Sequence, residues 1–111
     1  MSVWHVTGGR RLEGSVTVQG AKNAALPIMA ASVLAPCETE LLNVPLLKDV
    51  DTTVRILRGL GCAVSRDGDA MTIDSRGLSR AEIPHPLMRE LRSSVILLGA
   101  VLARCGEARV S

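Results

Sequence analysis

Apolar residues dominate the segment from Ala24 to Leu34, where they would cover nearly every side of a helix. Such a pattern predicts a helix buried between layers instead of one lying on a surface. Pro27 has no backbone N–H and is tolerated in or near a first helical turn, so the helix is predicted to start near Ala24 with Asn23 as its N-cap. Ala35-Pro36 ends the predicted helix.

Alternating apolar and polar residues predict several short strands. Two of them are joined through Asp67-Gly68-Asp69, which is a strong hairpin signal. The predicted strands cover residues 3–6, 15–19, 38–44, 62–66 and 70–74.

A second helix is predicted over residues 51–60, where Val50, Val54, Leu57 and Leu60 recur at helical spacing. Asp51 near its start and Arg58 near its end complement the helix dipole, and Gly61 beyond it matches a glycine C-cap. From residue 15 to residue 74 the predicted order is therefore strand, helix, strand, helix, strand, strand.

A third helix is predicted after Pro84 and Pro86, ending near Gly106. Its apolar stripe consists of Leu87, Leu91, Val95, Leu98 and Leu102. The last residues, 109–111, have the pattern of an opening strand. A strand without neighbours would leave an unfinished sheet edge, so we expect the polypeptide to continue.

The composition is that of one small soluble domain: 111 residues, of which 47% are hydrophobic. The chain has no Phe or Tyr and a single Trp, Trp4, which removes the aromatic platforms of common single-strand RNA binders. A formal net charge of +2 without a polybasic tract gives no indication of nucleic acid or of an anionic membrane as partner. No signal segment or membrane span is visible.

Three cysteines, Cys37, Cys62 and Cys105, are odd in number and widely separated, which indicates neither a disulfide framework nor a zinc site. Reduced thiols in a cytoplasm are the simplest explanation, so we expect a cytoplasmic protein.

Lys22 stands where the first helix is predicted to begin. A helix N-terminus carries roughly half a positive elementary charge, so it disfavours a lysine unless an anion is close. With an anion present, the same arrangement becomes a receptor for a phosphate or carboxylate group. The alternative, a solvated loop lysine, remains open from this local pattern.

Three stretches of the chain form a recognisable set: Gly20-Ala21-Lys22-Asn23-Ala24-Ala25-Leu26-Pro27, then Asn43-Val44-Pro45 with Leu47-Lys48-Asp49-Val50-Asp51, and Leu91-Arg92-Ser93-Ser94. Together they resemble the N-terminal part of one family, the UDP-N-acetylglucosamine 1-carboxyvinyltransferases, which are the enolpyruvyl transferases of bacterial cell-wall synthesis. Sister enzymes that act on shikimate 3-phosphate typically have Gly-Ser-Lys-Ser where this chain has Gly20-Ala21-Lys22-Asn23, which favours the sugar-nucleotide branch.

The resemblance implies an α/β (α+β) fold, in which a βαβαββ unit forms part of an inside-out α/β barrel that is incomplete here. It further implies a two-lobed protein several times longer. Residues 1–19 would be N-terminal strands that join the other lobe. Residues 20–111 would be a partial catalytic lobe, with one unit to about residue 75 and the start of the next. The missing C-terminal lobe would be the main partner of this chain.

The family reaction moves the enolpyruvyl group of phosphoenolpyruvate to the 3-hydroxyl of UDP-N-acetylglucosamine, without a metal or redox cofactor. The resemblance implies that Lys22, acting electrostatically, and Asn23 contact phosphoenolpyruvate, and that Arg92 contacts the UDP-sugar. Asp49 and Asp51 could support the site through the Lys48 turn, but acids at a helix N-terminus that stabilise the helix dipole are the simpler interpretation, so both are left out of the predicted site. The family's proton-donor Cys lies in a Pro-Gly-Gly-Cys loop beyond Ser111, so the isolated chain is expected to be inactive.

Two alternatives belong to the same analysis. One is an enzyme of the 3-phosphoshikimate 1-carboxyvinyltransferase kind, against which Asn23 argues. The other is a stand-alone RNA-binding βαβαββ module, which would require salt-dependent RNA affinity and a face rich in Lys and Arg. The mild charge and the lack of aromatic residues disfavour it.

Overall fold

The computed structural model describes residues 2–90 and 94–110, which form helices and short strands. The described residues contain both helices and strands, as predicted for an α/β (α+β) protein. In chain order the elements are α1 (Lys22–Ala31), β1 (Glu38–Leu41), α2 (Lys48–Leu60), β2 (Ala63–Asp67), β3 (Ala70–Asp74), β4 (Glu82–Ile83), α3 (His85–Glu90), α4 (Ser94–Cys105) and β5 (Arg109–Val110).

The main sheet has three antiparallel strands in the order β1-β3-β2. The predicted hairpin is confirmed: Asp67 pairs with Ala70, and Gly68 in the turn has a φ of 61°. On the central strand β3, Met71 and Ile73 are fully buried and alternate with half-buried neighbours. One face of the sheet therefore packs on the core. A second, two-stranded sheet pairs β4 with β5 in parallel, which confirms the predicted strand at residues 109–110.

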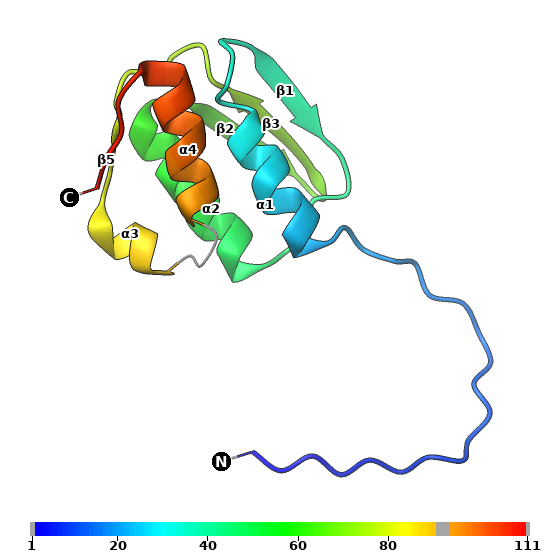
Figure 1. The fold of residues 1–111 in the computed structure, drawn as a ribbon. Coiled ribbons are helices and arrows are strands. Elements are labelled where there is room, and N and C mark those ends of the chain that lie inside the picture. Colours follow the sequence, from blue (N-terminus) through cyan, green and yellow to red (C-terminus); the bar gives the residue numbers. More distant parts are fainter. Residues whose placement is uncertain (1, 91–93, 111) are drawn as a thin grey trace.

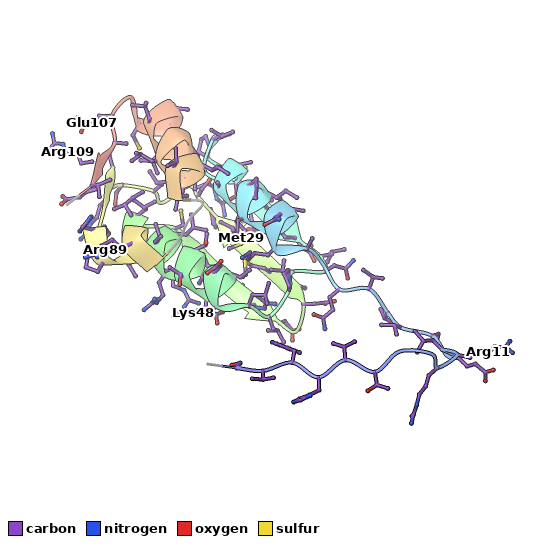
Figure 2. The ribbon with its side chains drawn as sticks, turned by 60° about the horizontal axis from the view of Figure 1, so that its bottom comes forward. Arg11, Met29, Lys48, Arg89, Glu107 and Arg109 are labelled. Atoms are coloured by element: carbon purple, nitrogen blue, oxygen red, sulfur yellow. The ribbon has the colours of Figure 1, made fainter. Side chains whose placement is uncertain are left out.

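The core lies between this sheet face and the helices (Figure 1). α2 packs on β2 and on α1, and α1 packs on α4. Met29 of α1 lies inside this body with none of its side chain exposed (Figure 2). Ile56, Leu57 and Leu60 of α2 are equally buried. The core is thus aliphatic, as the missing aromatic residues require.

The second helix is confirmed and begins three residues earlier than predicted, at Lys48. Asp49 and Asp51 lie in its first turn and Arg58 in its last, where their charges complement the helix dipole. Gly61 ends it with a left-handed φ of 108°, and its N–H donates to the carbonyls of the last turn, as expected of a glycine C-cap.

The prediction of strands over residues 3–6 and 15–19 is wrong for the structure as described. Residues 2–20 contain no strand and extend away from the body as a single arm (Figure 1). Their apolar side chains, including Trp4 at 88% exposure, have no sheet to pack against. A strand needs a hydrogen-bonded neighbour, and the described residues supply none. The predicted βαβαββ unit is consequently observed as αβαββ.

The first helix starts earlier and ends earlier than predicted, at Lys22 and Ala31. Asn23 is therefore inside the helix, and its predicted role as N-cap is wrong. Pro27 lies in the second turn and not in the first, so the helix contains a proline at a position where one backbone hydrogen bond is lost. After Ala31 the chain continues in a tighter turn, in which Val33 and Leu34 donate to carbonyls three residues back.

The expectation that this helix is buried between layers is also wrong for the described residues. Leu26, Met29 and Ala30 face the core, whereas Ile28 and Leu34 are half exposed. The near-uniform apolar composition gave no information on which side would be covered.

Two helices, α3 and α4, are described where one was predicted, and residue 91 of the predicted stripe lies outside the described residues. Along α4 the predicted stripe is displaced, because Val95 and Leu102 are largely exposed while Leu97 and Val101 are buried. Residues 95–103 are all apolar or glycine, so packing against α1, and not polarity, selects the buried face. The described helices include none that is long and apolar enough to cross a membrane.

Candidate anion site at the start of α1

The start of α1 leaves backbone donors available. Ala21 is the N-cap and has an extended conformation, with a φ of −87° and a ψ of 137°. Its carbonyl accepts from the N–H groups of Ala24 and Ala25, at 3.2 and 2.9 Å. The first N–H groups of the helix, those of Lys22 and Asn23, have no helical carbonyl to bind, and the alanine at the N-cap has no polar side chain to accept from them. Such donors can bind an anion.

A close crossing of two chain segments fixes where this helix begins. Gly20 lies directly against the loop before α2: a Cβ at this position would be 2.9 Å from the carbonyl carbon of Asn43 and would overlap its oxygen. Asn43 itself has a left-handed φ of 59°. Val44 N–H donates to the carbonyl of Asp69 at 2.9 Å, which anchors the same loop to the β2–β3 turn. The crossing brings the starts of α1 and α2 together.

Lys22 is the first residue of α1, and its ammonium forms an ion pair with Asp49 in the first turn of α2. The distance from Nζ to Oδ2 is 3.2 Å, and the two side chains are 47% and 30% exposed. Lys22 is therefore a helical, ion-paired residue and not a loop residue, and its side chain remains in contact with solvent. The anion that a lysine needs at a helix N-terminus is supplied here by the chain itself.

The helix dipoles reinforce the positive character of this region. α1, α2 and α4 run in the same direction, with their N-termini toward the lower part of the body as drawn (Figure 1). Lys48 marks the start of α2 at that end of the body (Figure 2). Thr53 Oγ1 donates to the carbonyl of Asp49 at 2.8 Å within the same helix start. The starts of α1 and α2 carry two lysines, Lys22 and Lys48, and two aspartates, Asp49 and Asp51, so the side-chain charges balance and the helix dipoles supply the positive character that favours an added anion.

Beside the α1 start lies a hollow of about 170 Å³. Small side chains keep the helix slim on this side, since Ala21, Ala24 and Ala25 line it together with Ile28. On the other side it is bounded by residues 41–44 and by Gly20. Such a volume exceeds the share of several water molecules, so a small molecule has room in it, although neither Lys22 nor Asn23 lines the hollow.

The structure places the predicted site residues unequally. Lys22 and Asn23 are neighbours at the α1 start, and Asn23 is exposed to solvent. Arg92 lies outside the described residues, between the last residue of α3 and the first residue of α4. Asp49 was left out of the predicted site residues, and the structure places it in the first turn of α2, which begins three residues before the predicted start.

The described residues also contain three free thiols and no metal-binding group. Cys37 and Cys105 are exposed and Cys62 is buried, and none of the three pairs with another. Within residues 2–90 and 94–110, no three or more His, Cys, Asp or Glu side chains gather closely enough to hold a metal ion.

Comparison with known proteins decides the family. The model of the EPSP synthase (3-phosphoshikimate 1-carboxyvinyltransferase) family matches residues 6–111. The chain belongs to this family of enolpyruvyl transferases. A solved relative in the family, the enolpyruvyl transferase NikO from Streptomyces tendae, superposes with a TM-score of 0.79 at 31% identity, over 91% of this chain and 24% of that one. The predicted enolpyruvyl transferase fold is thus confirmed for a partial chain.

Curated relatives are named UDP-N-acetylglucosamine 1-carboxyvinyltransferase. The protein of Geotalea uraniireducens is 46% identical over 96% of this chain, and that of Acinetobacter baylyi is 45% identical over 100% of this chain. The protein of Shewanella amazonensis is 48% identical over 96% of the chain. The chain spans 25–27% of the length of these relatives.

Proposed function

We propose that this chain is the N-terminal part of a transferase that moves the enolpyruvyl group of phosphoenolpyruvate to the 3-hydroxyl of UDP-N-acetylglucosamine. The observation that carries the proposal is the identity of 43–48% to proteins of that name, over 96–100% of the chain. The α1 start supports it, because a lysine and free backbone donors at a helix N-terminus suit a phosphate or carboxylate ligand.

In the proposed site Lys22 and Asn23 bind phosphoenolpyruvate, and Arg92 binds the UDP-sugar. Lys22 contributes a compact ammonium and Asn23 an amide that donates and accepts. Both stand on the first turn of α1, so the rigid helix fixes their positions relative to the helix N–H groups.

The chemistry to be catalysed has two stages. In the first, C3 of phosphoenolpyruvate gains a proton and the sugar 3-hydroxyl attacks C2 while losing its own proton. In the second, the tetrahedral adduct loses phosphate from C2 and a proton from C3, which restores the double bond. The phosphate and carboxylate stay negative through these steps. Fixed positive groups such as Lys22 and the α1 dipole would hold the substrate in line and stabilise the departing phosphate. The proton donor belongs to the part of the protein that follows this chain.

The remaining assignments rest on the same proposal. Residues 1–19 would complete a sheet in the other lobe, and residues 20–111 would be a part of the catalytic lobe. The reaction would be the first committed step of peptidoglycan synthesis in the cytoplasm, and so would serve cell shape and division.

An enzyme acting on shikimate 3-phosphate is the competing assignment, because the family model carries that name. The similarity to sugar-nucleotide transferases and the Lys22-Asn23 pair favour the UDP-sugar. Family membership also favours either transferase over a stand-alone RNA-binding module.

The test is phosphate release by the complete polypeptide that contains this chain. We expect release from phosphoenolpyruvate in the presence of UDP-N-acetylglucosamine and none with shikimate 3-phosphate. The 111-residue chain alone should release no phosphate. Activity with shikimate 3-phosphate only would refute the assignment. Turnover by the isolated 111-residue chain would refute the proposal that this chain lacks part of the active site.

A further inference from the structure

We propose that Asp49 is a positioning residue, which holds the Lys22 ammonium in place for phosphoenolpyruvate. The inference rests on the proposed function and adds to it a residue that does not itself touch the substrate. Its basis is the 3.2 Å ion pair between Lys22 Nζ and Asp49 Oδ2, which joins the starts of two helices.

The backbone at both ends of this ion pair is fixed. Lys22 is the first residue of α1, and Gly20 two residues earlier is packed against Asn43. Asp49 is the second residue of α2, and its carbonyl accepts from Thr53 Oγ1 at 2.8 Å. The flexible part of the arrangement is the four-carbon stem of Lys22, which a contact with Asp49 would immobilise.

The ion pair leaves the lysine competent to bind a ligand. An ammonium has three N–H donors, and one contact to Oδ2 uses one of them. The 47% exposure of the Lys22 side chain shows that solvent, and hence a small anion, reaches it. The α2 dipole stabilises the negative charge of Asp49 in the first turn, so the carboxylate is favoured at the position from which it contacts the ammonium.

A purely structural role does not explain the contact well. Both partners keep substantial contact with water, and ion pairs in that setting add little to folding stability. Asp49 would support the α2 dipole without reaching Lys22, as Asp51 does from the same turn. Asp51 is exposed and carries the same charge, which makes it the matched control.

The experiment compares Asp49→Asn, Asp49→Glu and Asp51→Asn in the complete polypeptide, with phosphoenolpyruvate as the varied substrate. We expect Asp49→Asn to raise KM for phosphoenolpyruvate about tenfold while kcat changes less than about twofold, since the ammonium is still present but no longer held. Asp49→Glu should recover part of the affinity, and Asp51→Asn should behave as the wild type.

A second readout does not depend on activity. The rate at which an amine-reactive reagent labels Lys22, relative to exposed Lys48, is measured by mass spectrometry with and without phosphoenolpyruvate. Asp49→Asn should accelerate labelling of Lys22, and Asp51→Asn should not.

Four results would overturn the inference. They are equal effects of Asp49→Asn and Asp51→Asn, a lower KM in Asp49→Asn, a loss of kcat and thermal stability with KM unchanged, and identical labelling of Lys22 in all variants. If the wild-type protein releases no phosphate, the proposed function fails, and the labelling ratio alone then decides whether Asp49 holds Lys22.

Discussion

At the scale of single residues, the charges at the helix starts define the candidate site. Lys22 stands at the positive end of α1, which disfavours it, and the partly exposed ion pair with Asp49 recovers only a small part of that cost. The lysine is thus retained at a position where a neutral residue would suit the helix better. Such a conflict with local preference is typical of a functional position.

Lys22→Ala in the complete enzyme should weaken the handling of phosphoenolpyruvate far more than it disturbs folding. Loss of a charge-assisted hydrogen bond is worth about 1.5–3 kcal/mol, which corresponds to about ten- to a hundredfold in kcat/KM. Steady-state kinetics and thermal unfolding measure the two effects. Normal kinetics with a large drop in Tm would show that Lys22 is structural. Lys22→Arg is unsuitable as a control because a planar guanidinium differs from an ammonium.

The pKa of Asp74 is a second residue-scale prediction. Hydrogen bonds from the Arg76 side chain, at 2.7 and 2.9 Å, and from its backbone N–H lower this pKa from 3.8 to about 2. Because the folded pKa is lowered, the associated stability is present above pH 4 and is lost as the pH falls toward 2. Arg76→Ala should return the Asp74 pKa toward its ordinary value in a carboxyl NMR titration. Ordinary titration in the wild type would contradict the contact.

The three thiols should react at different rates. Burial raises the pKa of the Cys62 thiol, although the nearby Arg104 opposes the shift. Burial also keeps reagents away from the sulfur, so the raised pKa and the poor access both slow its reaction. Exposed Cys37 and Cys105 should be labelled first, and Cys62 only as the chain unfolds. Peptide mapping after brief treatment with a thiol reagent measures this order. Early labelling of Cys62 would show that this part of the core is open.

At the scale of elements, local signals predicted most of the fold. The hairpin turn, the Gly61 cap and the acids at the start of α2 depend on neighbouring residues only, and all three were correct. The N-terminus of α1 was misplaced because Pro27 was assigned to the first turn, whereas the start is fixed by the contact of Gly20 with Asn43. Contacts between distant segments leave no mark in a local pattern.

Gly20→Ala tests that contact. The added Cβ would overlap the Asn43 carbonyl, which is backbone and cannot swing aside, so we expect a loss of about 1–3 kcal/mol and weaker binding of phosphoenolpyruvate. Gly59→Ala is the control, because nothing lies within 4 Å of a Cβ in that part of α2. Because alanine favours the helix more than glycine does, Gly59→Ala should raise the free energy of unfolding by up to about 1 kcal/mol. Denaturant unfolding measures both, and equal effects would contradict the crossing.

At the scale of the whole molecule, the chain has a larger surface than its size requires. The accessible area is 7832 Å², whereas a folded chain of 11.7 kDa is expected to have about 5,900 Å². The radius of gyration is 17.1 Å, compared with about 13 Å for a compact domain of this length. The arm of residues 2–20 accounts for this visibly (Figure 1), and Arg11 lies at its far bend (Figure 2).

The sequence could not predict the fate of the arm, because residues 15–19 alternate correctly and lack only a partner strand. The role of Arg92 in the site stays a prediction, because this residue lies outside the described residues. The sequence indicated Lys22 and Asp49 only as two separate charges near helix starts. Their ion pair could not be predicted, because it depends on how α1 and α2 pack.

An apolar face across α1 and α4 should make the isolated chain bind hydrophobic dyes. Leu34, which follows α1, and Ile96 of α4 are 52% and 47% exposed and line the same groove between these segments. Replacing both with serine should lower dye fluorescence severalfold and leave Tm nearly unchanged. Val33→Ser, at a fully buried position, should instead lower Tm and raise dye binding. Unchanged fluorescence in the double variant would show that the dye binds elsewhere.

The most direct test of the central claim is to read the native gene beyond the codon for Ser111. If this chain is the first quarter of a sugar-nucleotide enolpyruvyl transferase, the frame continues for roughly three further lengths of this chain and soon encodes a Pro-Gly-Gly-Cys-like loop. A stop codon directly after Ser111 would contradict the claim, since neither the proton-donor loop nor a second lobe could then join the site at Lys22.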